Sequence, residues 1–135
     1  MKKSLFALVG LAITTLILTG CGKADLSQVD GETLDTHPRL QEVADTWETM
    51  KESAINKDCT TLLSYMRSSL NLTEESCTVA YEYFAEAPEV DWARTDWSTE
   101  DGKAKIYQTD RGSITSFIYD GRYKIWRADS EFWAE

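Results

Sequence analysis

The stretch that decides the fold is Asp101–Ala128, which reads DGKAKIYQTDRGSITSFIYDGRYKIWRA. Apolar and polar residues alternate along it, and this period of two is typical of half-buried β-strands. Asp-Gly pairs and one Asp-Arg-Gly triplet interrupt the alternation, and such residues supply the positive φ angles that tight hairpin turns require. Three short turns in succession predict an antiparallel meander. With one strand upstream, the predicted strands are Val90–Ser98, Lys103–Thr109, Ser113–Tyr119 and Arg122–Ala128.

Ahead of the strands, the apolar spacing changes to the 3.6-residue period of amphipathic helices. Pro38 suits a first helical turn, and the spacing predicts helices over Leu40–Ile55, Cys59–Leu70 and Thr73–Ala87. Helices followed by hairpins predict an α+β domain, in which three N-terminal helices pack on one face of a curved, four-stranded antiparallel sheet. We assign this single domain to residues 37–135, a length that can bury a core of modest size.

Two segments resemble a known family. Ala54–Leu63 (AINKDCTTLL) is similar to the helix–turn–helix opening of nuclear-transport-factor-2-like, SnoaL-like domains, and Asp120–Trp126 (DGRYKIW) resembles their closing hairpin. The resemblance covers about Leu40 to Arg127 and implies a cystatin-like, cone-shaped fold that can hold a pocket. One departure from the family pattern is that a strand often found between the second and third helices has no candidate in this sequence.

Aromatic side chains would line the pocket that the resemblance implies. The candidates come from the helices and from the strands: Trp47, Tyr81, Phe84, Tyr107, Phe117 and Trp126. Such a pocket would suit a flat or apolar ligand, whereas the alternative is that the same rings fill the cone as core.

Further aromatic rings exceed what a small core needs, so we expect some of them at the surface, in a contact patch near the first strand and the C-terminal residues. These rings are Trp92, Trp97, Tyr119, Tyr123, Phe132 and Trp133.

Catalysis finds little support in the sequence. Members of the resembled family that are isomerases, cyclases or hydrolases place an Asp or His deep in the cone as acid or base. His37 precedes the first predicted helix and is expected in solvent, while Asp91 and Asp96 point to opposite faces of the first predicted strand. The sequence contains no Gly-rich phosphate loop, nucleophile elbow or metal-ligand cluster. We therefore assign no catalytic residue and expect no cofactor.

The N-terminal residues describe an export signal. Two lysines and a short apolar run precede Leu18-Thr19-Gly20-Cys21, which matches a bacterial lipobox at every position. The run is too short for a spanning helix, which needs about 20 apolar residues. The resemblance to bacterial lipoproteins implies that residues 1–20 are a cleaved signal peptide and that Cys21 is acylated and anchors the chain in a membrane. Gly22 follows where an Asp would suggest retention in the inner membrane.

Residues 21–36 are predicted as the lipidated cysteine and a flexible, acidic tether, because they contain few large apolar residues and no clear period. The alternative is that Leu26, Val29 and Leu34 dock on the domain. Cleavage would remove Lys2 and Lys3 and no acidic residue, which changes the net charge from −9 to −11. This balance argues against a nucleic-acid partner and against a polybasic contact with anionic lipid.

Lipid on Cys21 leaves Cys59 and Cys77 as the two thiols of an exported domain. Such a pair usually oxidises outside the cytoplasm, and closing this loop would stabilise the fold by roughly 3 kcal/mol. A zinc site needs four ligands, and the sequence has one histidine, His37, and no C-x-x-C motif. We predict a structural disulfide and no metal.

These inferences predict a lipid-anchored protein that faces the periplasm or the cell exterior, on the outer membrane if the cell has two membranes. We favour a non-catalytic module that binds an envelope protein or a small apolar ligand. The alternatives are an exclusion or immunity lipoprotein of a mobile element, and a small-molecule enzyme that uses a carboxylate in the cone. A second copy of the chain is a further candidate partner.

Overall fold

The computed structural model describes residues 23–97, 102–110, 112–130 and 132–133, so the predicted signal peptide and Cys21 lie outside the described residues. Within these ranges no helix is long and apolar enough to cross a membrane. The helices are α1 (Gly31–Thr36), α2 (Leu40–Ile55), α3 (Cys59–Ser64) and α4 (Glu74–Glu86), with 3₁₀ turns η1 (Ser68–Leu70) and η2 (Trp92–Arg94). The strands are β1 (Asp96–Trp97), β2 (Lys103–Gln108), β3 (Gly112–Asp120) and β4 (Ile125–Ala128).

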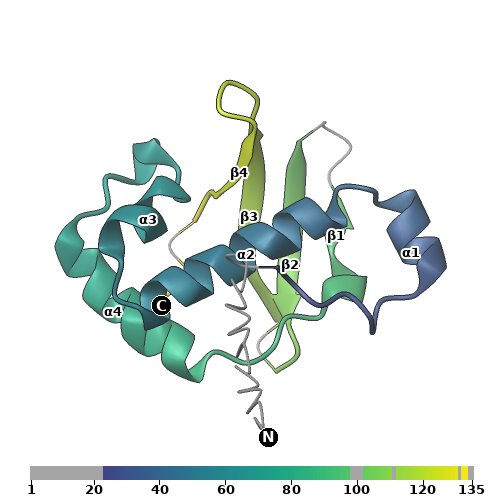
Figure 1. The fold of residues 1–135 in the computed structure, drawn as a ribbon, viewed down its shortest axis with the longest axis horizontal. Helices are drawn as coiled ribbons and strands as arrows, with labels where there is room; N and C mark the ends of the chain where they lie inside the picture. The colour runs from purple at the N-terminus through teal and green to yellow at the C-terminus, as the bar shows by residue number, and fades with distance from the viewer. Residues whose placement is uncertain (1–22, 98–101, 111, 131, 134–135) are drawn as a thin grey trace, which may run out of the picture.

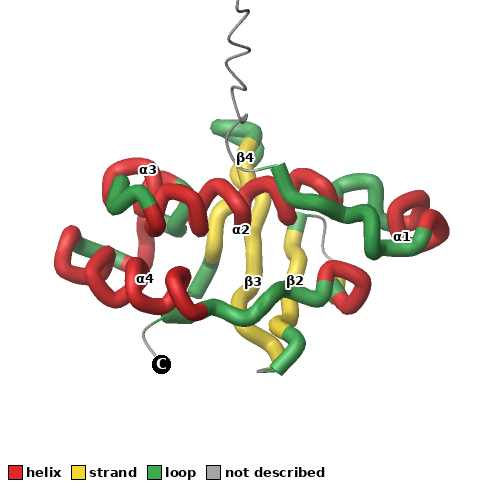
Figure 2. Tube along the Cα trace, turned by 60° about the horizontal axis from the view of Figure 1, so that its bottom comes forward, coloured by secondary structure: helices red, strands yellow, loops and turns green. Residues whose placement is uncertain are grey.

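The architecture is α+β, as predicted, with helices on one side of an antiparallel sheet (Figures 1 and 2). The strand order β1-β2-β3-β4 is the predicted meander. Two finer expectations differ from the structure. The described residues form four α-helices in place of three, because α1 lies ahead of the predicted helices, and the sheet is open, so the expected cone is not formed as such.

Helix α2 crosses the sheet and has the bounds that the sequence predicted. Its apolar face places Val43, Trp47 and Met50 in the main core, opposite Ile106 and Phe117 of the sheet. Two contacts tie the start of α2 to the sheet. Trp126 of β4 donates from Nε1 to a Glu42 carboxylate oxygen at 2.9 Å, and the guanidinium of Arg39, just before α2, lies 3.8 Å from the centre of the Tyr119 ring of β3.

Helix α3 is shorter than predicted because the chain leaves the helix to pair with a strand. It ends at Ser64, and the backbone N–H of Arg67 then donates to the Ala128 carbonyl while the N–H of Ala128 donates to the Tyr65 carbonyl. Met66 thereby forms a parallel bridge with Ala128. Backbone pairing therefore occurs between α3 and α4, at a residue that the sequence analysis assigned to its second helix.

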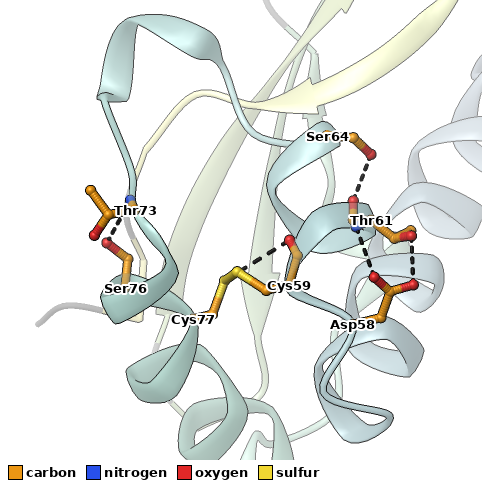
Figure 3. Close-up of a disulfide and its surroundings, with 7 residues drawn as sticks. All are labelled: Asp58, Cys59, Thr61, Ser64, Thr73, Ser76 and Cys77. Atoms are coloured by element: carbon orange, nitrogen blue, oxygen red, sulfur yellow. Dashed lines mark hydrogen bonds between the residues drawn. A yellow bond between two sulfur atoms is a disulfide. The ribbon is translucent and has the colours of Figure 1, made fainter.

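The predicted disulfide is present and joins α3 to α4 (Figure 3). Cys59 opens α3, Cys77 lies in the second turn of α4, and their Cα atoms are 5.7 Å apart. Asp58 caps α3 through a hydrogen bond from the Thr61 amide, and the hydrogen bonds from Thr61 lower the pKa of the Asp58 carboxyl. A reciprocal pair of hydrogen bonds between Thr73 and Ser76 begins α4. Both cysteines are thus held on capped helix ends.

The flexible tether predicted for residues 21–36 is wrong for the part that the structure describes. Ala24, Leu26 and Val29 are buried against Leu40 and Ala44 of α2. The backbone N–H of Ala24 donates to Asp45 at 2.9 Å, and the Gln41 side chain donates to the Ala24 carbonyl at 3.1 Å. We call residues 24–36 the strap. These three apolar side chains dock a segment that its acidic residues had suggested would be exposed to solvent.

The first strand and the last turn also differ from the sequence prediction. Within the predicted strand Val90–Ser98, the described residues form a single bridge at Val90, then η2, then the two-residue strand β1. The Asp120-Gly121 turn is a four-residue loop in place of a tight hairpin, since Asp120 pairs with Ile125. Its positive φ falls at Lys124, not at Gly121. The Asp120 carboxylate accepts hydrogen bonds from the next backbone amides and so stabilises the wider loop.

Candidate functional site

The aromatic residues predicted to line a pocket separate into core and surface. Trp47, Phe84, Phe117 and Trp126 are at most 2% exposed, and Tyr81 packs half-buried against the same core. The Trp47 and Phe84 rings are in contact, with centroids 5.2 Å apart. These five residues therefore take the core role that the sequence analysis weighed as the alternative to a ligand pocket.

Tyr107 lies apart from the other five. It alternates along β2 with buried Ile106 and Gln108, so its ring projects from the opposite face of the sheet. Its hydroxyl donates to Asp96, and this hydrogen bond raises the pKa of the Tyr107 hydroxyl. The Arg94 guanidinium lies 4.4 Å from the centre of its ring.

The expected aromatic patch near the C-terminal residues is also wrong. Phe132 and Trp133 are 6% and 4% exposed, and the Phe132 ring contacts Trp47 and Phe84. Trp92, Trp97 and Tyr119 are half-buried, whereas Tyr123 is 59% exposed. His37, expected in solvent, stacks on the Trp97 ring with centroids 5.4 Å apart.

A groove of about 550 Å³ lies between the first described residues, α2 and the segment that follows α4. Six charged side chains line it together with seven apolar ones, which include Val29, Trp47 and Trp92; the charged ones are Lys23, Asp25, Glu48, Lys51, Glu89 and Asp91. Ligand pockets are mostly apolar with a few convergent polar groups. This groove is more highly charged than that, and the described residues hold no group of side chains arranged to bind a metal ion.

Within this groove, partial burial raises the pKa of the Glu48 carboxyl, with Lys51 opposing the effect and Glu89 adding to it. A raised folded pKa means that the folded chain binds more protons than the unfolded chain just above pH 4.5, so stability falls as pH rises through that window. We therefore expect Glu48→Gln to raise the melting temperature near pH 7, with an advantage that shrinks as pH falls toward 4.5. Melting curves of both proteins from pH 4 to 7.5 measure this.

Glu82→Gln is the matched control, because it makes the same change of net charge at an exposed position of α4. An equal gain in melting temperature for Glu82→Gln would show that relief of general acidic repulsion, not burial of Glu48, causes the effect.

The second face of the sheet is free of helices in the described structure (Figure 2). We call it the open face, and it presents these exposed or half-buried side chains: Asp96, Lys103, Lys105, Tyr107, Ile118, Asp120, Ile125 and Arg127. A hollow of about 370 Å³ lies at its β4 edge, lined in part by Arg67, Ile118, Tyr123 and Arg127. The sequence analysis assigned no functional role to the lysines of β2 or to the arginines of this hollow.

Ion pairs hold the arginines of the hollow in place. Arg127 donates from Nε to the Asp120 carboxylate at 2.9 Å and from Nη1 to the Ser64 carbonyl, while Arg67 donates to the Asp129 carboxylate at 2.6 Å. The guanidinium groups of Arg122 and Arg127 lie 5.4 and 5.2 Å from the centre of the exposed Tyr123 ring. The hollow is therefore a preformed surface of arginine–carboxylate pairs beside an exposed aromatic ring.

Charge is divided between the two sides of the domain. The sequence from Arg94 to Arg127, which contains the whole sheet apart from Ala128, has seven Lys or Arg and five Asp or Glu. Helices α2 and α4 together carry eight acidic residues and one lysine. A chain of net charge −9 thus has a small positive excess from Arg94 to Arg127 and a large negative excess on α2 and α4.

No family model, curated protein or solved structure matches this chain.

Proposed function

We propose that this chain is a lipid-anchored protein of the bacterial envelope that acts as a non-catalytic interaction module. The lipobox at Leu18–Cys21 supports the anchor. The observation that carries the interaction role is the open face, a cationic and aromatic surface on the side of the sheet away from an acidic helical layer. An exclusion or immunity lipoprotein would use a surface of the same kind.

Binding is favoured over catalysis by the state of the predicted pocket. The enzyme hypothesis needs a carboxylate deep in an apolar cavity, where desolvation would adapt it as an acid or base. Five of the six aromatic side chains proposed to line that cavity are part of the core, where the Trp47 and Phe84 rings are in contact. Glu48, whose carboxyl has a raised pKa, is instead half-exposed in the groove beside α2.

We infer membership of the nuclear-transport-factor-2-like, SnoaL-like family as part of the same proposal. Two observations support it: the helices precede an antiparallel meander, and Met66 bridges Ala128 between α3 and α4, where that family often has a strand. In this proposal the core aromatics fill the cone, so a small apolar ligand is not its natural occupant.

The anchor is tested by Cys21→Ser. We expect the wild-type protein to sediment with membranes and to incorporate labelled palmitate, because two or more acyl chains give stable anchoring. The variant should lose the label and leave the membrane pellet after alkaline carbonate extraction. Cell fractionation with metabolic labelling measures both results.

The double variant Cys59→Ser/Cys77→Ser is the matched control, since it leaves Cys21 as the only thiol. It should retain the label and stay in the pellet. Unchanged labelling of Cys21→Ser would refute acylation at this cysteine.

A further inference from the structure

We propose that the open face binds an acidic segment of another envelope protein, and that the strap holds this face on the side of the domain away from the bilayer. The second statement rests on the lipid anchor proposed above, whereas the first does not depend on it.

The register of the sheet sets two cations on either side of an apolar residue. Lys103 pairs with Ile118, and Ile118 pairs with Arg127 on the next strand. Opposed side chains in antiparallel strands lie about 5 Å apart. Lys105 follows Lys103 on the same face at about 7 Å, the separation of alternate residues in an extended chain. Alternate carboxylates of an extended acidic segment repeat at the same distance and can meet both lysines.

The hollow adds directional donors to this pattern. A guanidinium group has five N–H donors, and the bonds to Asp129, Asp120 and Ser64 engage one donor of Arg67 and two of Arg127. Arginine recognises carboxylates through paired, charge-assisted hydrogen bonds. The Tyr123 ring, 59% exposed beside these arginines, offers an apolar contact to the same segment. The hollow therefore suits an acidic residue next to an apolar one.

Charge complementarity selects an acidic occupant and its position. The open face and its hollow carry five lysines and arginines (Arg67, Lys103, Lys105, Arg122 and Arg127) against three aspartates (Asp96, Asp120 and Asp129). This excess of positive charge attracts an acidic segment, whereas the eight acidic residues of α2 and α4 repel it. The whole chain carries a net charge of −9, so its overall charge would repel an acidic segment. Binding of such a segment therefore requires a local surface with an excess of positive charge.

The position of the strap favours a protein over the bilayer as the occupant of the open face. Ala24 is bonded to Gln41 and Asp45 of α2, and the strap runs on the helical side of the sheet (Figure 2). The link from Cys21 to Ala24 spans at most about 11 Å, and a helix with side chains is itself about 10 Å thick. The lipid therefore enters the bilayer beside α2, while the open face lies beyond the sheet.

The binding test uses the full chain in neutral detergent and a fluorescent octaglutamate peptide at low ionic strength. We expect saturable binding by fluorescence anisotropy that weakens as salt screens the charges. Lys103→Glu/Lys105→Glu should weaken it at least tenfold. The matched control Lys51→Glu/Lys57→Glu makes the same change of net charge on the helical side and should change the dissociation constant less than threefold.

Tyr123→Ala guards against a misfolded double variant, since an exposed side chain can be removed without unfolding the chain. It should weaken binding of an octaglutamate peptide that carries one leucine more than binding of octaglutamate itself. Equal weakening by the two double variants, or no binding to the wild type, would overturn the proposal. Self-association of the chain that is lost in Lys103→Glu/Lys105→Glu would also overturn it, because the occupant would then be a second copy.

Orientation is tested in vesicles that contain phosphatidylglycerol and a spin-labelled lipid, with a fluorophore on Lys23→Cys or on Lys105→Cys. We expect the lipid to quench the probe at position 23 and not the probe at 105. Quenching at neither position would reject the anchor and leave the acidic-segment proposal standing. Quenching at 105 would show that the open face lies on lipid and would overturn the proposal.

Discussion

Phe84→Ala should lower the free energy of unfolding by about 3–5 kcal/mol, the usual cost of removing a buried phenyl ring. Phe84 is 2% exposed, and its ring contacts that of Trp47 in α2 and those of the adjacent C-terminal residues Phe132 and Trp133. The substitution leaves a cavity that these rings cannot fill without moving the helix or the C-terminal residues. Guanidinium unfolding followed by tryptophan fluorescence measures the loss.

Tyr123→Ala is the control for Phe84→Ala. It also removes an aromatic ring, but an exposed one, so stability should change by less than about 0.5 kcal/mol. A loss below about 1 kcal/mol for Phe84→Ala would mean that the ring borders an unfilled space, and the ligand-pocket hypothesis would then regain its support.

Loss of the disulfide should lower the free energy of unfolding by about 3 kcal/mol, because the bridge between Cys59 and Cys77 closes a loop of 18 residues in the unfolded chain. This corresponds to a fall of roughly 15 °C in melting temperature. Cys59→Ala and Cys77→Ala should cost similar amounts, and the double variant should be no worse than either. Differential scanning calorimetry under oxidising conditions measures all three.

Reduction of the wild-type protein supplies an independent check on the bridge. A reducing agent should lower its melting temperature to that of the double variant and leave the double variant unchanged. Equal melting temperatures of wild type with and without the reductant would contradict a stabilising disulfide.

Sequence periodicity correctly predicted the helices whose ends are set by residues at those ends. Helix α2 has the predicted bounds, and α4 lies within one residue of them at each end, because Thr73 and Pro88 mark its limits locally. The end of α3 could not be predicted, since it depends on backbone pairing with Ala128, more than sixty residues away in sequence. The strap is a similar case: Leu26 and Val29 look isolated until the surface of α2 is present.

The candidate site was less accessible to prediction than the fold. The alternation in β2 could have shown that Lys103 and Lys105 share a face of the sheet. No local pattern, however, indicates that Arg67 and Arg127 line one hollow. Arg67 is brought beside β4 by the bridge that the preceding residue, Met66, forms with Ala128. Five of the six aromatic residues predicted around the pocket do lie together, but their spacing could not distinguish rings that line a space from rings that fill it.

The position of the disulfide in the chain has a consequence for the order of assembly. Both cysteines precede every strand of the sheet. In the proposed export, where the N-terminal end crosses the membrane first, α3 and α4 arrive in the oxidising compartment while the strands are still being threaded. The covalent link can therefore be made on the helical half alone. The meander then folds, as it emerges, onto helices that are already joined.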